Sequence, residues 1–283
     1  MPELPEVETV ARGLNQRIAG DVIDSVWLGE KPEPLKSPAA EIAFVLEHRR
    51  IVQVRRVGKH IVFDLQRSRR NMSRRAAALD GQWIVHLGMT GRLLIASSEV
   101  AMAKHTHAVL KLASGREVRF VDPRRFGRLA VVRIESKIAT GFAAPGDEPL
   151  QSQVGPFMAL FRGRKTPIKS ALLNQKLLSG VGNIYADESL FRAGIRPRRR
   201  AASLTRAELQ RLHIALKAVL REAIKLGGSS VNDYVDAEGQ EGLFQLRHRV
   251  YGREGEPCLV CGTAIKRVII AGRSSHYCSR CQK

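Results

Sequence analysis

The sequence predicts an α+β chain of several parts, with a helix and a β-rich region first, a helical region second and a cysteine-rich hairpin last. Three observations predict this order: apolar residues recur at helical spacing near the start, short β-branched runs fill residues 22–132, and two Cys-x2-Cys pairs close the chain. A length of 283 residues fits two domains with a small appendage.

The first element is a helix. The opening MPELPEVETV places Pro2 and Pro5 where proline suits a first helical turn, and its glutamates suit the positive end of the helix dipole. Helical spacing then relates Val7, Val10, Leu14 and Ile18, and Gly20 follows as a stop. On these residues alone, a helix entry is favoured over chemistry at this terminus.

The β-rich region follows, and we assign residues 1–142 to one domain. Runs such as IVFDL, QWIVHLGM and AVLKLA alternate with turn residues, which predicts a β-sandwich or a barrel-like pair of sheets. The segment 67–81 is rich in Arg, Ser and Ala and has no useful periodicity, so we expect an exposed loop there. Residues 143–151, AAPGDEPLQ, have the composition of a linker.

Helices dominate the region 152–244. The glycines around Val181 break one helical stretch into two, and a second stretch opens with a capping box from Thr205 to Glu208. Leu209, Leu212, Leu216 and Val219 then share one face of that second stretch, which predicts a core helix ending at Gly227-Gly228.

The charge of the chain indicates a polyanionic partner. Lys and Arg number 47 against 27 Asp and Glu, a net charge of +20. Residues 1–150 contribute +7 (24 basic, 17 acidic) and the remainder +13 (23 basic, 10 acidic). Nucleic acid is the expected partner, because neutralising phosphates releases counterions. No apolar run has membrane-spanning length and the charged start lacks a signal-peptide core, so we expect a cytoplasmic or nucleoid protein without membrane contact.

Four cysteines in the final part, residues 245–283, predict a metal site. Cys258-x2-Cys261 and Cys278-x2-Cys281 are separated by sixteen residues, a spacing typical of zinc ribbons. Four thiolates leave no open coordination position, so one Zn²⁺ here would be structural. The residues between the pairs, KRVIIAGRSSHY, predict a β-hairpin with Arg273 near its tip, where a solvated turn residue is the simplest interpretation.

Three glycine-flanked turns are candidates for nucleic-acid contact. HLGMTGRL and DPRRFGRL place Met89, Arg124 and Phe126 on turns, where they could form a wedge that unstacks bases. Met89 and Phe126 could equally be core residues, and spacing alone favours that alternative. The stretch from Ser179 to Asn183 could cradle a phosphate with helix N-terminal amides, or be only a tight turn between helices.

These motifs together resemble the bacterial formamidopyrimidine-DNA glycosylase family. The resemblance rests on MPELPEVETV, GKH at 58–60, HLGMTG, DPRRFG, GVGNIYADESLF and the terminal YGREGEPCLVCGTAI…YCSRCQK, and it covers the whole chain. It implies an N-terminal β-sandwich led by a helix, a helix-two-turns-helix domain and a zinc-finger β-hairpin. The related endonuclease VIII group typically begins Pro-Glu-Gly-Pro-Glu, so Leu4 favours the purine-lesion branch.

The resemblance implies a reaction at the N-terminus. After removal of Met1, the amine of Pro2 becomes the nucleophile and forms a Schiff base with the sugar, with Glu3 as the neighbouring acid/base and Glu6 as a supporting carboxylate. The pKa of an α-amino group is about 8, so part of this amine is uncharged at neutral pH. The resemblance also assigns Lys59 to the first (β) elimination and Arg273 to the second (δ) elimination.

The resemblance implies further contacts with DNA. The trio of Met89, Arg124 and Phe126 would fill the vacated base stack, and residues 229–244 would form a loop that closes over an extruded 8-oxoguanine. Backbone phosphates would be contacted by His105, Arg164, Lys169 and Asn183. Two features depart from the family: the loop 67–81 is longer than usual, and KHTHA at 104–108 leaves the role of His107 open.

The expected function is therefore a monomeric, bifunctional base-excision-repair enzyme, a glycosylase for oxidised purines in duplex DNA and an abasic-site lyase, with no obligate protein partner. Two alternatives stay open at this point. One is an endonuclease VIII-like glycosylase for oxidised pyrimidines, and the other is a lesion-binding protein without catalysis. A basic ribosome-associated zinc protein would explain the charge and the cysteines but not the opening sequence.

Overall fold

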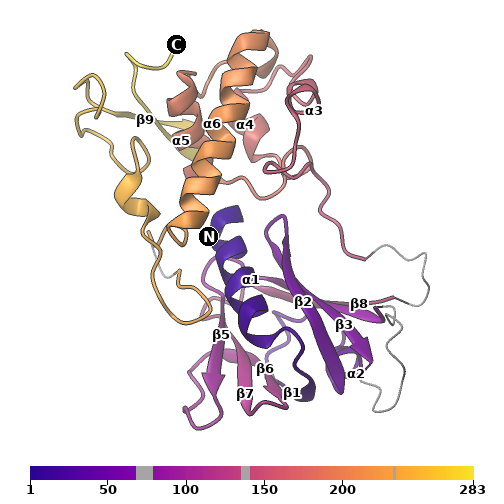
Figure 1. Cartoon of the computed structure of the whole chain (residues 1–283). Helices are drawn as coiled ribbons and strands as arrows, with labels where there is room; N and C mark the ends of the chain where they lie inside the picture. Colours follow the sequence, from indigo (N-terminus) through magenta and orange to yellow (C-terminus); the bar gives the residue numbers. More distant parts are fainter. Residues whose placement is uncertain (68–78, 135–140, 232–233) are drawn as a thin grey trace. The chain divides into compact units, whose positions relative to one another are not determined.

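The computed structural model describes residues 1–67, 79–134, 141–231 and 234–283, which fall into two compact units (Figure 1). The first unit contains the described parts of residues 1–2, 6–143 and 229–242. The second contains residues 3–5, the described parts of 144–228, and 243–283. Of the predicted loop 67–81, residues 68–78 lie outside the described residues.

The first unit is a helix with two antiparallel four-stranded sheets, which confirms the predicted helix and β-sandwich. One sheet has the order β1-β6-β7-β5 and the other has the order β2-β3-β4-β8. The helix is α1 (Leu4–Ile18), and its first residues belong to the second unit. The strands are β1 (Ile23–Leu28), β2 (Arg49–Val57), β3 (His60–Arg67), β4 (Gly81–His86), β5 (Arg92–Ser97), β6 (Thr106–Leu112), β7 (Arg116–Val121) and β8 (Arg128–Arg133).

The core of the first unit joins α1 to both sheets. The periodic residues Val7, Val10, Leu14 and Ile18 are all buried there, as the spacing predicts. A second helix, α2 (Ala39–Leu46), lies in the region expected to be entirely β. It buries Ile42, Val45 and Leu46 after Pro38 at its N-cap. Periodicity alone does not separate so short an apolar run from a strand, which is why the sequence pattern missed it.

The described residues of the segment 229–242 belong to the first unit, although the chain order suggested grouping them with the helical domain. The backbone amide of Ile95 donates to the carbonyl of Ala237 (3.0 Å), and Ala237 is buried. The hydroxyl of Tyr234 donates to the carbonyl of Glu6 (3.3 Å), and Glu238 forms an ion pair with Arg17. Tertiary contacts with α1 and β5 therefore override sequence order.

The second unit consists of helices and one β-hairpin (Figure 1). Its longest helix, α6 (Arg206–Lys225), packs against α5 (Asn183–Ala193), and the predicted capping box is present at Thr205 and Glu208. The other elements are α3 (Val154–Ala159), α4 (Ile168–Leu173), the 3-10 helices η1 (Ala201–Ser203) and η2 (Phe244–Arg247), and strands β9 (Lys266–Ile270) and β10 (Arg273–Tyr277). Among the described residues, we find no helix with the length and apolar character needed to cross a bilayer.

Candidate nucleic-acid site

Two turns of the first unit, residues 87–91 and 122–127, carry Met89, Arg124 and Phe126 and pack against each other. Asp122, fully buried, accepts hydrogen bonds from the hydroxyl of Thr90 (2.6 Å) and from the amide of Gly127 (2.7 Å). Gly88 lies at φ +64°, and a Cβ there would meet the carbonyl carbon of Phe126 at 2.5 Å. The turns 87–91 and 122–127 therefore form one rigid surface, and Asp122 is the residue that sequence reasoning missed.

This surface presents its apolar residues to solvent. Met89 is 44% exposed and Phe126 is 52% exposed, so the alternative that they belong to the core is wrong. The guanidinium of Arg124 lies over the ring of Phe126, 4.8 Å from its centroid. Neighbouring apolar side chains exposed on a rigid turn indicate an interaction surface and have the chemistry of a base-stack wedge.

The two histidines of KHTHA, His105 and His107, differ in burial and in role. The ring of His107 is buried, and its Nε2 lies 2.9 Å from the carbonyl of Asp122, so it supports the wedge turn. His105 is exposed in the left-handed region (φ +67°), and its carbonyl accepts the amide of Asp122 (3.0 Å). The open question about His107 thus receives a structural answer, whereas His105 stays accessible to a ligand.

Lys59 lies in the tight turn between β2 and β3. Its turn neighbour Gly58 adopts φ +60°. Arg56 holds this turn: its Nε pairs with Glu8 of α1 (2.8 Å) and its Nη1 donates to the carbonyl of Gly58 (3.1 Å). Lys59 itself is only 9% exposed.

Lys59 and Arg128 lie near two histidines, His60 and His86. Burial first, and then repulsion from His60, Arg128 and Lys59, lower the pKa of His86 to about 4. The rings of His60 and His86 lie 5.0 Å apart, centroid to centroid. A pKa of about 4 leaves His86 uncharged at neutral pH, so the positive charge here is that of Lys59 and Arg128, which suits an anion such as a phosphate.

Glu3 occupies the N-terminus of α5 in the second unit. The amide of Ile184 donates to its Oε1 (3.3 Å), and a Cβ at Gly182 would lie 2.1 Å from its Cδ, so a larger residue there would have to displace this carboxylate. The amide of the next residue, Leu4, donates to the carbonyl of Gly180 (3.0 Å). The helix N-terminus that could have cradled a phosphate is therefore occupied by the Glu3 carboxylate, which suits the helix dipole equally.

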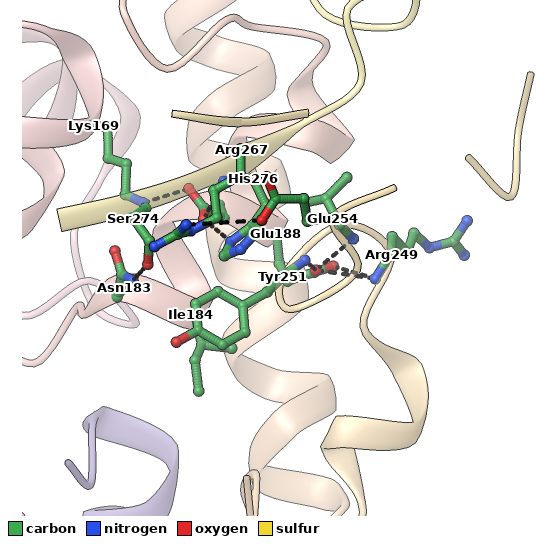
Figure 2. Close-up of polar contacts among 12 residues, drawn as sticks. Lys169, Asn183, Ile184, Glu188, Arg249, Tyr251, Glu254, Arg267, Ser274 and His276 are labelled. Atoms are coloured by element: carbon green, nitrogen blue, oxygen red, sulfur yellow. Dashed lines mark hydrogen bonds and ion pairs between the residues drawn. The ribbon is translucent and has the colours of Figure 1, made fainter. Parts of the chain in front are cut away.

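Lys169 and Asn183 lie beside the β9–β10 hairpin (Figure 2). Lys169 is fully buried, and its Nζ contacts Asp187 Oδ1 and the carbonyl of Ser274, both at 2.6 Å. The side-chain amide of Asn183 donates to Ser274 Oγ (3.3 Å). Burial lowers the pKa of Lys169, while the charges of Asp187 and Glu3 counteract that effect.

Two further residues of this cluster, Glu188 in GVGNIYADESLF and Tyr251 in YGREGEPC, lie in motifs of the sequence that gave neither residue a role. Tyr251 bonds with Asn183 and stacks edge-on against His276 (5.1 Å between centroids), and burial raises the pKa of its hydroxyl. Glu188, fully buried, accepts the amides of Arg249, Val250 and Tyr251 at 2.9–3.0 Å (Figure 2). Only the folded chain brings these residues together, because more than sixty positions separate Glu188 from Tyr251.

Arg273 and Arg164 are both exposed. Arg273 begins β10 directly after Ala271 and Gly272, which adopt φ +46° and +74° at the hairpin tip. It lies near enough to Lys169 and Tyr251 for its charge to act on both. Arg164 follows α3, and its Nε donates to the carbonyl of Leu160 (2.5 Å).

The four cysteines converge as the spacing predicts. Their Sγ atoms all lie within 4.8 Å of one another, and Cys258 and Cys278 are buried. They pack with Phe191, Val250 and Ile265 in a small core of their own. Four soft sulfur donors at this separation fit a tetrahedral Zn²⁺ and no hard cation, so the site holds one structural zinc ion.

Comparison with known proteins defines the class first. Three family models match in chain order: "Formamidopyrimidine-DNA glycosylase N-terminal domain" over residues 1–129, "Formamidopyrimidine-DNA glycosylase H2TH domain" over 145–235, and "Zinc finger found in FPG and IleRS" over 255–283. The fold and the sites thus define a zinc-finger protein of the DNA glycosylase class.

Individual relatives narrow the class to a family. The chain is 44% identical over 292 residues to a formamidopyrimidine-DNA glycosylase of Gluconobacter oxydans and 43% identical over 287 residues to one of Solibacter usitatus, with full coverage of both chains in each case. The crystal structure of the MutM (FPG) protein of Thermus thermophilus matches with a TM-score of 0.83 and 40% identity, covering 99% of this chain and 98% of that one. The chain belongs to the formamidopyrimidine-DNA glycosylase family.

A second structure adds DNA to the comparison. It is a complex between a mutant of the Lactococcus lactis FPG and a Fapy-dG-containing DNA, with a TM-score of 0.86, 32% identity and full coverage of both chains.

Proposed function

We propose that this protein removes oxidised purines, including 8-oxoguanine and formamidopyrimidines, from duplex DNA and then cleaves the resulting abasic site. The observation that carries the proposal is the position of the Glu3 carboxylate relative to the nearby charged groups. This carboxylate is fixed by the Ile184 amide within electrostatic reach of Lys169, and Lys169 is in turn within reach of Arg273. Family membership and the lesion-containing DNA of the Lactococcus lactis complex support the same conclusion.

In the proposed reaction, the amine of Pro2 attacks C1′ of the damaged nucleotide once Met1 has been removed. The C1′–N bond breaks and the base leaves with a proton. Glu3 protonates the ring oxygen O4′ as the C1′–O4′ bond opens, which leaves an iminium between Pro2 and C1′. A secondary amine forms this cation without losing a further proton, so it is an electron sink from the start.

Two eliminations follow from that cation. Loss of the C2′ proton expels the 3′ phosphate, and we assign Lys59 to this step because its charge and that of Arg128 act together near His86. Loss of a C4′ proton then expels the 5′ phosphate, and we assign Arg273 to that step. Water finally releases the sugar fragment and regenerates the amine of Pro2. Glu6, whose Oε1 accepts the amide of Ser229 (2.8 Å), supports the terminus.

The proposed DNA contacts involve exposed basic residues and the surface formed by the turns 87–91 and 122–127. Met89, Arg124 and Phe126 would fill the space of the extruded nucleotide, since base flipping leaves an unstacked gap. His105 and Arg164 are exposed and would bind backbone phosphates, with Asn183 as a further phosphate contact. With chromosomal DNA as its substrate, the protein is expected to act at the nucleoid and as a monomer.

Borohydride trapping tests the proposal. The protein is incubated with a duplex carrying 8-oxoguanine opposite cytosine, and mass spectrometry locates the cross-linked residue. We expect a reduced adduct on Pro2, faster with 8-oxoguanine than with a matched thymine glycol duplex. A zinc-loaded protein that lacks Met1 and binds the duplex but forms no adduct would contradict catalysis, and faster reaction with thymine glycol would indicate an endonuclease VIII-like specificity.

A further inference from the structure

A buried ion pair lies beneath the strand that begins with Arg273. Lys169 of α4 and Asp187 of α5 have no exposed side-chain surface, and their charged atoms lie 2.6 Å apart. By contrast, the pair of Arg192 and Glu222, which joins α5 to α6 in the same unit, leaves 21% and 36% of its side chains exposed. The complete burial of the first pair suggests a specific task.

Both partners of this pair also bond to β10, whose residues Ser274 and His276 are labelled together with Lys169 in Figure 2. Lys169 Nζ donates to the carbonyl of Ser274, and Asp187 Oδ2 accepts the backbone amide of His276 (2.9 Å) and lies 3.3 Å from its ring Nδ1. The pair therefore holds the first and third residues after Arg273 through their main chain. Arg273 itself stays exposed at the end of this clamped strand.

This arrangement leaves Lys169 little opportunity to contact phosphate directly. Its Nζ is buried and already bonded to a carboxylate and a carbonyl oxygen. Reaching solvent would leave Asp187 as an unpaired charge in the interior, which is strongly unfavourable.

Stability alone does not account for the pair. A buried ion pair is often no more stabilising than apolar residues of similar volume, because desolvation opposes the Coulombic attraction. Directional bonds to main-chain atoms are what apolar residues could not supply. A two-stranded hairpin is marginal by itself, so such bonds can decide where its tip residue points.

We propose that Asp187 and Lys169 are positioning residues that fix the β10 strand so that Arg273 is aligned for the second elimination. The inference rests on the proposed function, and it replaces the phosphate contact expected of Lys169 by an indirect role.

The test measures products rather than stability. A duplex with a preformed abasic site is cleaved, and gel electrophoresis separates the β-elimination product from the β,δ-elimination product. For Asp187→Asn we expect the ratio of δ to β product to fall at least about tenfold, while the rate of borohydride trapping stays within about twofold of the unmodified protein.

Two further variants keep the inference testable if Asp187→Asn does not fold. The double variant Lys169→Met, Asp187→Leu fills the site with apolar side chains, and zinc content and a thermal melt establish its folding. We expect it to fold with one zinc ion and still to give a low δ to β ratio. The control Glu222→Gln breaks the partly exposed pair between Arg192 of α5 and Glu222 of α6 (2.7 Å) and should leave the ratio unchanged.

The outcomes separate the inference from the function on which it rests. A folded double variant with the ratio of the unmodified protein overturns the inference. Arg273→Ala should lower the ratio as well, and adding Asp187→Asn to it should lower the ratio no further; an additional decrease would mean that Asp187 does not act through Arg273. An unmodified protein that forms no trapped adduct would overturn the proposed function itself.

Discussion

The turns that carry Lys59 and Arg273 are stabilised in different ways. Lys59 lies between two long strands of a four-stranded sheet, and its turn is fixed by the partly accessible pair of Arg56 and Glu8. Arg273 lies on an isolated hairpin of two five-residue strands, held by a metal site and a completely buried pair. A turn inside a large sheet needs only a light restraint, whereas a marginal hairpin depends on buried charges and a metal.

Removing zinc should have the largest effect, and it should affect the two turns unequally. Structural zinc contributes on the order of 10 kcal/mol to small domains, so a chelator should unfold the region around Cys258 and Cys278 and disorder Arg273. Both tryptophans, Trp27 and Trp83, belong to the first unit and should keep their fluorescence. Amide hydrogen exchange should show loss of protection in β9, β10 and the cysteine-bearing turns but not in the sheets of the first unit, and a simultaneous tryptophan change would contradict independent stabilisation.

Acid should weaken both units through one buried histidine in each. Burial is the main cause that lowers the pKa of His86 and of His248 to about 4, below the unfolded value near 6.5. Between these two pKa values the unfolded state therefore binds more protons than the folded state. The stability that each neutral, buried histidine contributes is fully present above about pH 6.5 and is lost as the pH falls toward 4.

The expected loss is on the order of 3 kcal/mol for each histidine. Denaturant unfolding at pH 7.5 and pH 4.5, followed by tryptophan fluorescence, should show a smaller pH dependence in His86→Gln. His248→Gln should reduce the pH dependence only in circular dichroism of the helical unit. If the unmodified protein, His86→Gln and His248→Gln all showed the same pH dependence, these two histidines would not be its cause.

Arg56→Met should affect the Lys59 turn more modestly. It removes the bonds to Glu8 and to the Gly58 carbonyl, which together should cost about 1–3 kcal/mol of unfolding free energy. We expect a several-fold slower first elimination with base excision nearly unchanged, measured by rapid quench on abasic and 8-oxoguanine duplexes. The matched control is Arg55→Met on the same strand, because its partner Asp64 keeps bonds from Gln53 and Gln82.

Arg12→Ala should have the smallest effect. Its pair with Glu8 is an exposed i,i+4 contact (2.7 Å), and such pairs contribute less than about 0.5 kcal/mol. Thermal unfolding and product ratios should match those of the unmodified protein. A larger loss would mean that Arg12 orients Glu8 toward Arg56, which would make the Lys59 turn depend on a network rather than one pair.

Local patterns were sufficient for several elements. The period of Val7, Val10, Leu14 and Ile18 predicted α1, and the Thr205 to Glu208 capping box predicted the start of α6. Each depends on interactions within about four residues, so the sequence carries them directly. The helix α2 was missed because its eight residues are too few for a period to be distinctive.

The positioning residues had no such pattern. Asp122 bonds to Thr90, thirty-two positions away, and Asp187 bonds to His276, eighty-nine positions away. Nothing in the residues near either aspartate indicates these partners. Met89 and Phe126 were ambiguous for a related reason, because an apolar residue on a turn is buried or exposed according to what packs beneath it.

The sequence by itself determined the order of the parts, the zinc ligands and the polyanionic partner, because periodicity, ligand spacing and net charge are local or additive properties. The tertiary structure decided that Glu3 takes the N-terminus of α5, that the described residues of 229–242 belong to the first unit, and that Lys169 is buried against Asp187. These features depend on which groups, far apart in the sequence, are buried together in the folded protein. The cost of burying an unpaired charge then selects the partners, and no short stretch of sequence records that choice.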